Sequence, residues 1–65
     1  MNIRIRTDII HRRITELMLT RADIAEAISI SVKTMDSILC RGTCSPITMG
    51  RLARVLGVEP WELVA

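Results

Sequence analysis

Two helix-start signals within the stretch 20–42 constrain this chain more than any other feature of its sequence. Thr20, followed three residues later by Asp23, matches the reciprocal N-cap in which each side chain bonds the other residue's backbone N–H. Ser31 can cap a second helix, and Gly42 can end that helix because glycine readily adopts the left-handed conformation. Apolar residues recur at helical spacing after each signal, namely Ile24, Ala25 and Ile28, then Met35, Ile38 and Leu39. The stretch is therefore predicted to form two short helices joined by a tight turn.

The segment before this stretch contains one clear helix pattern. From Thr7, a predicted N-cap, apolar residues at helical spacing predict a first helix whose buried side consists of Ile10, Ile14, Leu17 and Met18. Residues 1–6 alternate apolar and basic side chains as a strand does, but a strand in so small a chain has no evident pairing partner. We expect residues 1–6 to be either a flexible basic arm or a lead-in to the first helix.

The segment after this stretch contains two further helix patterns. Ser45 followed by Pro46 is a strong start signal, since proline fits the first helical position. This helix is predicted to end at Gly57 and to bury Met49, Leu52, Ala53 and Leu56. Pro60 opens a last short helix, in which Trp61 and Leu63 can cover the open end of the core. Together the patterns predict an all-α fold, a compact bundle of four to five short helices that contains a helix-turn-helix.

Length and composition narrow the class of protein further. A chain of 65 residues is predicted to form a single domain, 1–65, with one small core. Apolar residues make up 49% and charged residues 25%, which is typical of a globular chain. No apolar run reaches the length of a membrane span, and the N-terminus lacks the apolar middle of a signal peptide. We expect a cytoplasmic protein with no membrane partner, whose net charge of +2 is too small to indicate nucleic-acid binding by itself.

Residues suited to catalysis or metal binding are scarce. His11 is the only histidine, and the only two cysteines, Cys40 and Cys44, are spaced too widely for a Cys-x-x-Cys pair. Too few ligands are present for a closed zinc site, and both thiols are expected to stay reduced. The chain also lacks a glycine-rich phosphate loop and an assembled Ser-His-Asp set. We expect no enzymatic activity, no cofactor and no small-molecule site.

Positions 21–40 resemble the helix-turn-helix of the Cro/phage-repressor (XRE-type) family. The six places where that family keeps an apolar or small residue are occupied here by Ile24, Ala25, Ile28, Ile30, Met35 and Ile38. The family usually has glycine in the turn, where this chain has Ser29, and often has glycine just before a Leu-Thr pair, where this chain has Met18. The segment Val55–Val58, VLGV, is similar to the end of a later helix in the family. The resemblance implies a lambda repressor-like fold.

The resemblance also implies that the helix at about 32–41 enters the major groove of double-stranded DNA. Its outward positions match those that the family uses towards DNA bases, namely Ser31, Val32, Lys33, Asp36, Ser37 and Cys40. Lys33 could donate to guanine O6 or N7, whereas Asp36 could accept from a cytosine amino group, form an ordinary salt bridge or repel phosphate. Phosphate contacts are expected from helix N-termini and flanking donors, at Thr20, Arg21, Arg41, Thr43 and Ser45. The competing interpretation is that this face is simply the solvated side of a small helical bundle.

A monomer with so few contacts would bind DNA weakly, so we expect a homodimeric transcriptional regulator that reads half-sites about 34 Å apart. Candidates for its dimer surface are Val58, Trp61, Leu63 and Val64, which could instead complete the monomer's own core. The alternative is a protein-interaction module that keeps the fold with little or no DNA binding. The small net charge and Asp36 in the predicted reading helix support that alternative. An antitoxin, which binds both DNA and a toxin, lies between the two.

Overall fold

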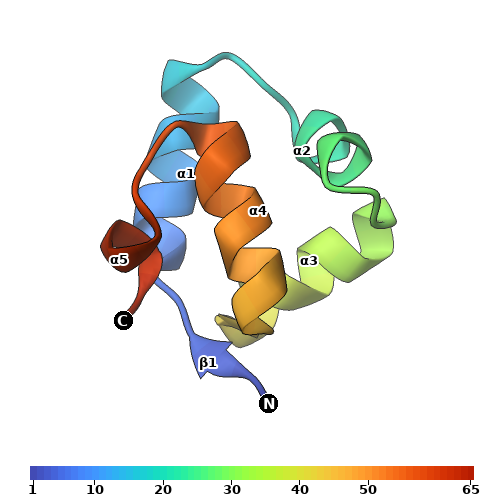
Figure 1. Ribbon diagram of the computed structural model, residues 1–65. Helices are drawn as coiled ribbons and strands as arrows, with labels where there is room; N and C mark the ends of the chain where they lie inside the picture. The colour runs from blue at the N-terminus through green and yellow to red at the C-terminus, as the bar shows by residue number, and fades with distance from the viewer.

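Five helices surround one apolar core in the computed structural model, which describes residues 1–65 (Figure 1). They are α1 (Thr7–Glu16), α2 (Arg21–Ala27), α3 (Val32–Arg41), α4 (Pro46–Leu56) and α5 (Pro60–Leu63). α1, α2 and α5 all pack against α4, whereas α3 packs mainly against α2. Helices account for 65% of the residues, so the predicted all-α bundle is confirmed. None of the helices combines the length and the apolar content that crossing a membrane requires.

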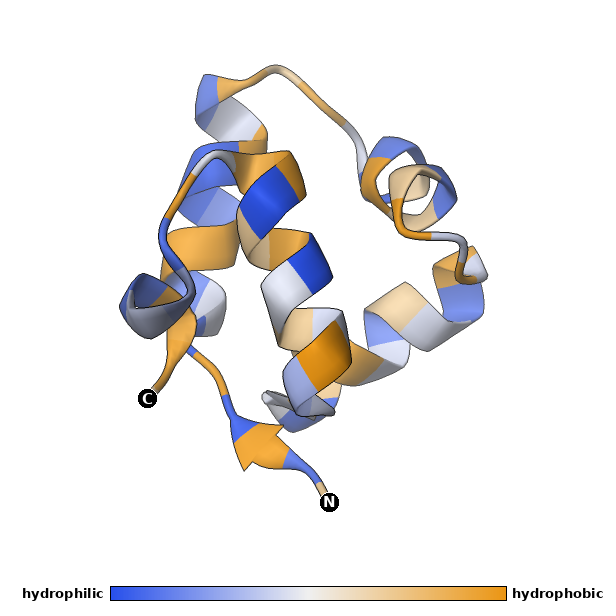
Figure 2. Cartoon of the chain, in the orientation of Figure 1, coloured by the Kyte–Doolittle hydropathy of each residue, from blue (hydrophilic) through white to orange (hydrophobic).

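The core consists of eleven buried residues, none of which is polar or charged. They are Ile5, Ile10, Ile24, Ala25, Ile28, Met35, Cys44, Leu52, Ala53, Leu56 and Leu63. Apolar and polar residues alternate around the longer helices, so each helix can turn one side inward (Figure 2). The stripes predicted for α2 and α4 lie in this core, with Met49 half-buried at its edge. Trp61 is 72% exposed, so the prediction that it covers the core is wrong, whereas Leu63 is fully buried as predicted.

The two ends of α1 differ from the prediction. Thr7 is the first helical residue and not the N-cap; Arg6 is the N-cap, and its side chain makes no capping hydrogen bond to the helix backbone. At the other end α1 stops at Glu16, and Leu17 and Met18, which were predicted to be buried, are exposed. The backbone turns at Met18, and the next apolar residue, Leu19, packs against the core in its place.

The N-terminal segment is part of the packed structure. β1 (Ile3–Arg4) pairs antiparallel with β2 (Thr43–Cys44), in a register that sets Ile3 opposite Cys44. The next residue, Ile5, is buried and forms an isolated bridge with Val64. Residues 3–5 therefore lie between two distant segments of the chain. The expectation that a strand here would have no partner is wrong, and so is the alternative that residues 1–6 form a flexible basic arm.

Side-chain caps begin α2, α3 and α4 where the sequence predicts them. Thr20 Oγ1 accepts from the Asp23 N–H at 3.0 Å, and the Asp23 carboxylate accepts from the Thr20 N–H at 2.8 Å, so the reciprocal N-cap is complete. The other predicted start and stop residues also take these roles, Ser31 and Ser45 as N-caps and Gly42 and Gly57 as left-handed ends. These local signals fix the bounds of the helices before any tertiary contact is considered.

Two residues other than glycine adopt the left-handed conformation, Met18 with φ 54° and Ser29 with φ 61°. Each follows a helix and reverses the chain direction, and each occupies a place where the XRE-type pattern has glycine. A side chain in this conformation costs roughly 1 kcal/mol relative to glycine, because Cβ approaches the following carbonyl oxygen. The chain tolerates this strain at both helix ends.

We expect Met18→Gly to stabilise the protein. The Met18 side chain is 89% exposed, so its removal sacrifices little packing. Relief of the positive φ should raise the free energy of unfolding by about 1 kcal/mol, measured by urea denaturation. Met18→Ala is the matched control, because it removes the same side chain but keeps Cβ and its strain. Equal stability of the glycine and alanine variants would show that φ at position 18 is not strained.

Candidate nucleic-acid interface

A tight turn between α2 and α3 holds the N-terminal end of α3 at the surface. The turn closes through a 2.9 Å hydrogen bond from the Ile30 N–H to the Ala25 carbonyl, with Ser29 in its left-handed conformation. Met35 is the only fully buried residue of α3, and the residues of its first turn are exposed, Val32 at 45%. One side of α3 is therefore anchored in the core, and the opposite side faces solvent from its first residue onward.

Five of the six predicted base-contacting residues are exposed, namely Ser31, Val32, Lys33, Asp36 and Cys40. Ser37 is half-buried. The Ser31 hydroxyl already accepts from the Thr34 N–H at 3.0 Å and donates to Thr34 Oγ1 at 2.9 Å, so its main role is to cap α3. Lys33 takes part in no ion pair, and its ammonium is free to donate.

Asp36 forms the salt bridge that was one of its three predicted roles. Its Oδ1 accepts from Arg21 Nη1 at 3.0 Å, which links the start of α2 to the middle of α3. Both side chains are about half exposed, so the pair adds at most about 1 kcal/mol to stability. The pair also joins a predicted phosphate contact, Arg21, to a predicted base contact. Thr20, beside Arg21, uses its hydroxyl to cap α2.

The remaining predicted contacts meet in a shallow hollow of about 250 Å³ between α3, β2 and the start of α4. Ser37, Arg41, Thr43 and Ser45 all line it. Arg41 is exposed and takes part in no ion pair. Ser45 caps α4 by accepting from the Thr48 N–H, and since Pro46 has no N–H, only the Ile47 N–H stays uncommitted at this end. The predicted phosphate contacts therefore form two groups, one at the start of α2 and one in this hollow.

The same hollow is lined by three polar residues that were not predicted as contacts, Asn2, Thr34 and Thr48. Thr34 and Thr48 each stand three residues after a capping serine, and each hydroxyl accepts from that serine at 2.9 Å. The Ser-x-x-Thr spacing at the starts of α3 and α4 is the sequence pattern from which the positions of Thr34 and Thr48 could have been predicted. Asn2 had no such signal, because it reaches the hollow only through the pairing of β1 with β2.

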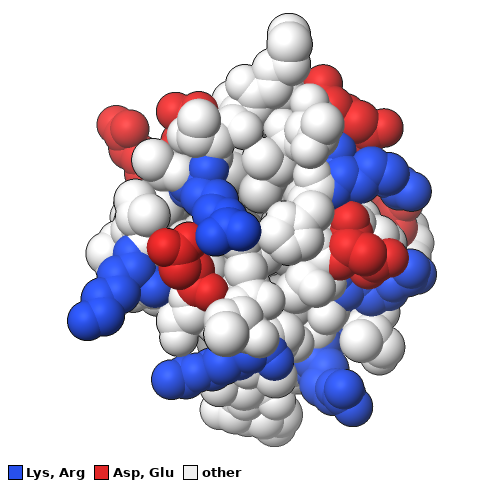
Figure 3. Space-filling view, turned by 180° about the vertical axis from the view of Figure 1, so that it is seen from behind, with Lys and Arg blue, Asp and Glu red and all other residues white.

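Positive charge is spread over the surface. Figure 3 shows Lys and Arg side chains interleaved with Asp and Glu over the face that it displays. Three of the arginines are engaged in ion pairs, Arg6 with Asp8, Arg13 with Glu16 and Arg21 with Asp36. The hydrogen bond from Arg6 lowers the pKa of the Asp8 carboxyl and raises that of the Arg6 guanidinium. On α3 itself, Lys33 and Arg41 remain unpaired, one near each end of the helix.

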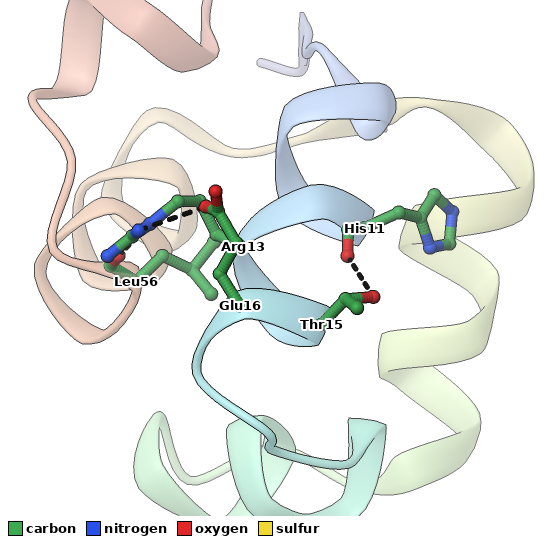
Figure 4. Close-up of polar contacts among 5 residues, drawn as sticks. All are labelled: His11, Arg13, Thr15, Glu16 and Leu56. Atoms are coloured by element: carbon green, nitrogen blue, oxygen red, sulfur yellow. Dashed lines mark hydrogen bonds and ion pairs between the residues drawn. The ribbon is translucent and has the colours of Figure 1, made fainter.

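Arg13 is a structural residue and not part of a basic surface. Its Nε donates to the Leu56 carbonyl at 2.9 Å, and its Nη1 donates to Glu16 Oε1 at 3.0 Å (Figure 4). Leu56 is the last residue of α4, so the guanidinium satisfies a free carbonyl at the negative end of that helix. A side chain of α1 thereby fastens α1 to the C-terminal end of α4.

The histidine and the cysteines form no reactive group. The His11 side chain is exposed, and only its backbone carbonyl is engaged, by the Thr15 hydroxyl at 3.0 Å (Figure 4). Cys40 is exposed and Cys44 is buried, and both are free thiols. Burial raises the pKa of the Cys44 thiol.

Comparisons of the chain with protein-family models, with curated proteins and with solved structures find no match.

We expect Arg13→Met to lower the free energy of unfolding by about 1–2 kcal/mol, because it leaves the Leu56 carbonyl without its charged donor. The Arg13 side chain is only 27% exposed, so solvent compensates poorly for the lost bond. Arg12→Met, at an exposed neighbouring position, is the matched control and should change stability little. Thermal unfolding followed by circular dichroism measures both, and equal midpoints would contradict this role for Arg13.

The two thiols should differ strongly in reactivity. A thiol reagent added to the folded protein is expected to modify Cys40 quickly and Cys44 only after unfolding. Cys44 is both inaccessible and held in its protonated form, and only the thiolate reacts. Mass spectrometry of timed samples measures this, with Cys40→Ser as the control that isolates Cys44. Rapid modification of Cys44 in that variant under native conditions would mean that β2 does not stay packed.

Proposed function

We propose that this chain binds double-stranded DNA sequence-specifically and regulates transcription, with α3 in the major groove. The observation that carries the proposal is the exposed first turn of α3, which presents the unpaired Lys33 beside Val32. The major groove admits an α-helix whose N-terminal side chains meet base edges. The resemblance of positions 21–40 to the XRE-type helix-turn-helix supports the same orientation.

In this proposal Lys33 carries most of the base recognition. Its ammonium donates to guanine O6 or N7, and the Val32 side chain packs against a thymine methyl group. Cys40 lies further along the exposed side of α3, where it can make apolar contact with a base. Ser37 lies at the edge of the hollow and is better placed for the sugar-phosphate side of the groove.

Phosphate contacts come from the two groups of residues that flank α3. In the hollow, Arg41, Thr43 and the Ile47 N–H, the one uncommitted N–H at the start of α4, supply donors for one strand. Arg21, at the start of α2, supplies donors for the other strand. Its salt bridge with Asp36 holds the guanidinium beside α3, and the partial exposure of the pair leaves other N–H groups free.

So small a set of contacts supports binding by two copies, which read half-sites about one helical turn, 34 Å, apart. Affinity should then fall steeply as salt rises, because each phosphate contact displaces a counterion. A cytoplasmic location forms part of the proposal, since reducing conditions keep Cys40 and Cys44 as free thiols.

A second candidate function is a protein-interaction module, of which an antitoxin is one kind. The mixed charge in Figure 3 and the acidic Asp36 on the outward side of α3 favour it. Such a protein would show no salt-dependent binding to duplex DNA at low ionic strength and would co-purify with a protein partner. Binding to random duplex DNA that weakens with salt favours the first candidate.

Selection of bound duplexes from a random pool tests the proposal. We expect the wild-type chain to yield a motif and Lys33→Ala to lose preference at one base position, at a cost of about 1–3 kcal/mol. Arg21→Ala should weaken all sequences alike, because it contacts phosphate. Arg12→Ala, on the exposed side of α1, is the matched charge control. A selection without a motif, or one indifferent to Lys33, would refute this assignment.

A further inference from the structure

A second hollow, of about 590 Å³, lies between the outer side of α4 and the turn that precedes α5. We call it the α4–α5 face; its lining includes Ile47, Gly50, Arg51, Arg54, Val58 and Glu59. One large apolar side chain of this lining, Ile47 on α4, is 70% exposed. Trp61 on α5 is 72% exposed and directly follows Pro60, which also lines the hollow. Figure 2 shows apolar and charged segments alternating along α4, which lies at the front of that view.

Gly50 on this face has no explanation within the chain. It stands in the middle of α4, where glycine destabilises a helix relative to alanine. Its φ is not positive, and a Cβ built on it would meet nothing within 4 Å. The fold therefore does not need a glycine at this position. A bare stretch of helix backbone is useful where another chain approaches closely.

The charges of the α4–α5 face are complementary to one another. Arg51 and Arg54 on α4 take part in no ion pair, and neither do Glu59 and Glu62 beside Trp61. In a two-fold arrangement the same patch meets itself, so the arginines of one copy can face the glutamates of the other. An unrelated partner would have to supply both signs of charge in matching order, whereas a second copy supplies them automatically.

We propose that the α4–α5 face binds a second copy of this chain, with Trp61 of each copy packed against the Gly50 side of α4 in the other. The face shares no residue with the hollow between α3 and α4, so both surfaces can be occupied at once. This inference deepens the homodimer within the proposed function by naming its surface. It also changes the expected surface, because Leu63, one of the predicted dimer residues, is fully buried in the monomer.

Self-association is measured without DNA, so its failure leaves DNA binding untouched. Sedimentation equilibrium from about 1 µM to 1 mM should show a monomer–dimer equilibrium. Trp61 is the only tryptophan of the chain, so its emission should shift to the blue and become less accessible to acrylamide as the dimer forms. A chain that stays monomeric throughout, with unchanged emission, overturns the proposal.

Two single substitutions test the surface. Trp61→Ala should raise the dissociation constant at least about tenfold, since interface tryptophans commonly dominate binding. Gly50→Ala should raise the thermal midpoint of the monomer and yet weaken the dimer about tenfold, because the added methyl obstructs only the other chain. Met18→Ala and Arg12→Glu, at exposed positions outside the face, are controls that should leave association unchanged. A dimer unaffected by both test substitutions would place the contact elsewhere and overturn the proposal.

Charge reversal provides a separate test. The pair Arg51→Glu and Arg54→Glu makes the face wholly acidic, and the pair Glu59→Arg and Glu62→Arg makes it wholly basic. Each doubly substituted chain should be monomeric alone, whereas a mixture of the two should associate as a heterodimer. Circular dichroism establishes that each variant is folded. Self-association of either folded variant at the wild-type dissociation constant would contradict the proposed pairing.

Discussion

The packing of α4 against α1, α2 and α5 is the interaction on which the rest of this structure depends. Leu52, Ala53 and Leu56 are fully buried between these helices, and no polar group is buried with them. Helices of 4 to 11 residues are too short to persist alone in water, so each exists because its apolar side contacts this centre. α3 buries Met35 in the core and packs Ile38 and Leu39 half-buried against it, which leaves its opposite side exposed.

Much of the fold could be predicted because it is encoded locally. The reciprocal cap of Thr20 and Asp23, the start at Ser45 and Pro46, and the glycine ends of α3 and α4 each involve residues within one helical turn. The apolar stripes of α2 and α4 are local in the same sense, because helical spacing alone determines which side chains share a face. These signals predict the starts of α2, α3 and α4, the ends of α3 and α4, and the exposed side of α3.

The parts that could not be predicted depend on residues far apart in the sequence. Arg13 looks like one more surface cation until the Leu56 carbonyl, 43 residues away, is brought beside it. The pairing of β1 with β2 has the same character, and it is this pairing that brings Asn2 to the hollow beside α3. Helical periodicity predicted that the buried side of α1 extends to Leu17 and Met18. The helix ends at Glu16, because the chain reverses direction at Met18. Trp61 is exposed because it lies two residues from the buried Leu63, and residues at that spacing do not share a face of a helix.

The position of residues 3–5 between two later segments has a consequence during synthesis. Ile5 donates its N–H to the Gly42 carbonyl, Arg6 donates to the Leu63 carbonyl, and Ala65 donates to the Arg4 carbonyl. The ribosome makes this N-terminal segment first, but its last neighbours emerge from the exit tunnel only after residue 65. The nascent chain therefore keeps Ile5 and the inner side of α1 uncovered until translation of this region is finished. Residues 3–5 are therefore among the last to reach their native contacts, and their apolar side chains stay accessible to chaperones until then.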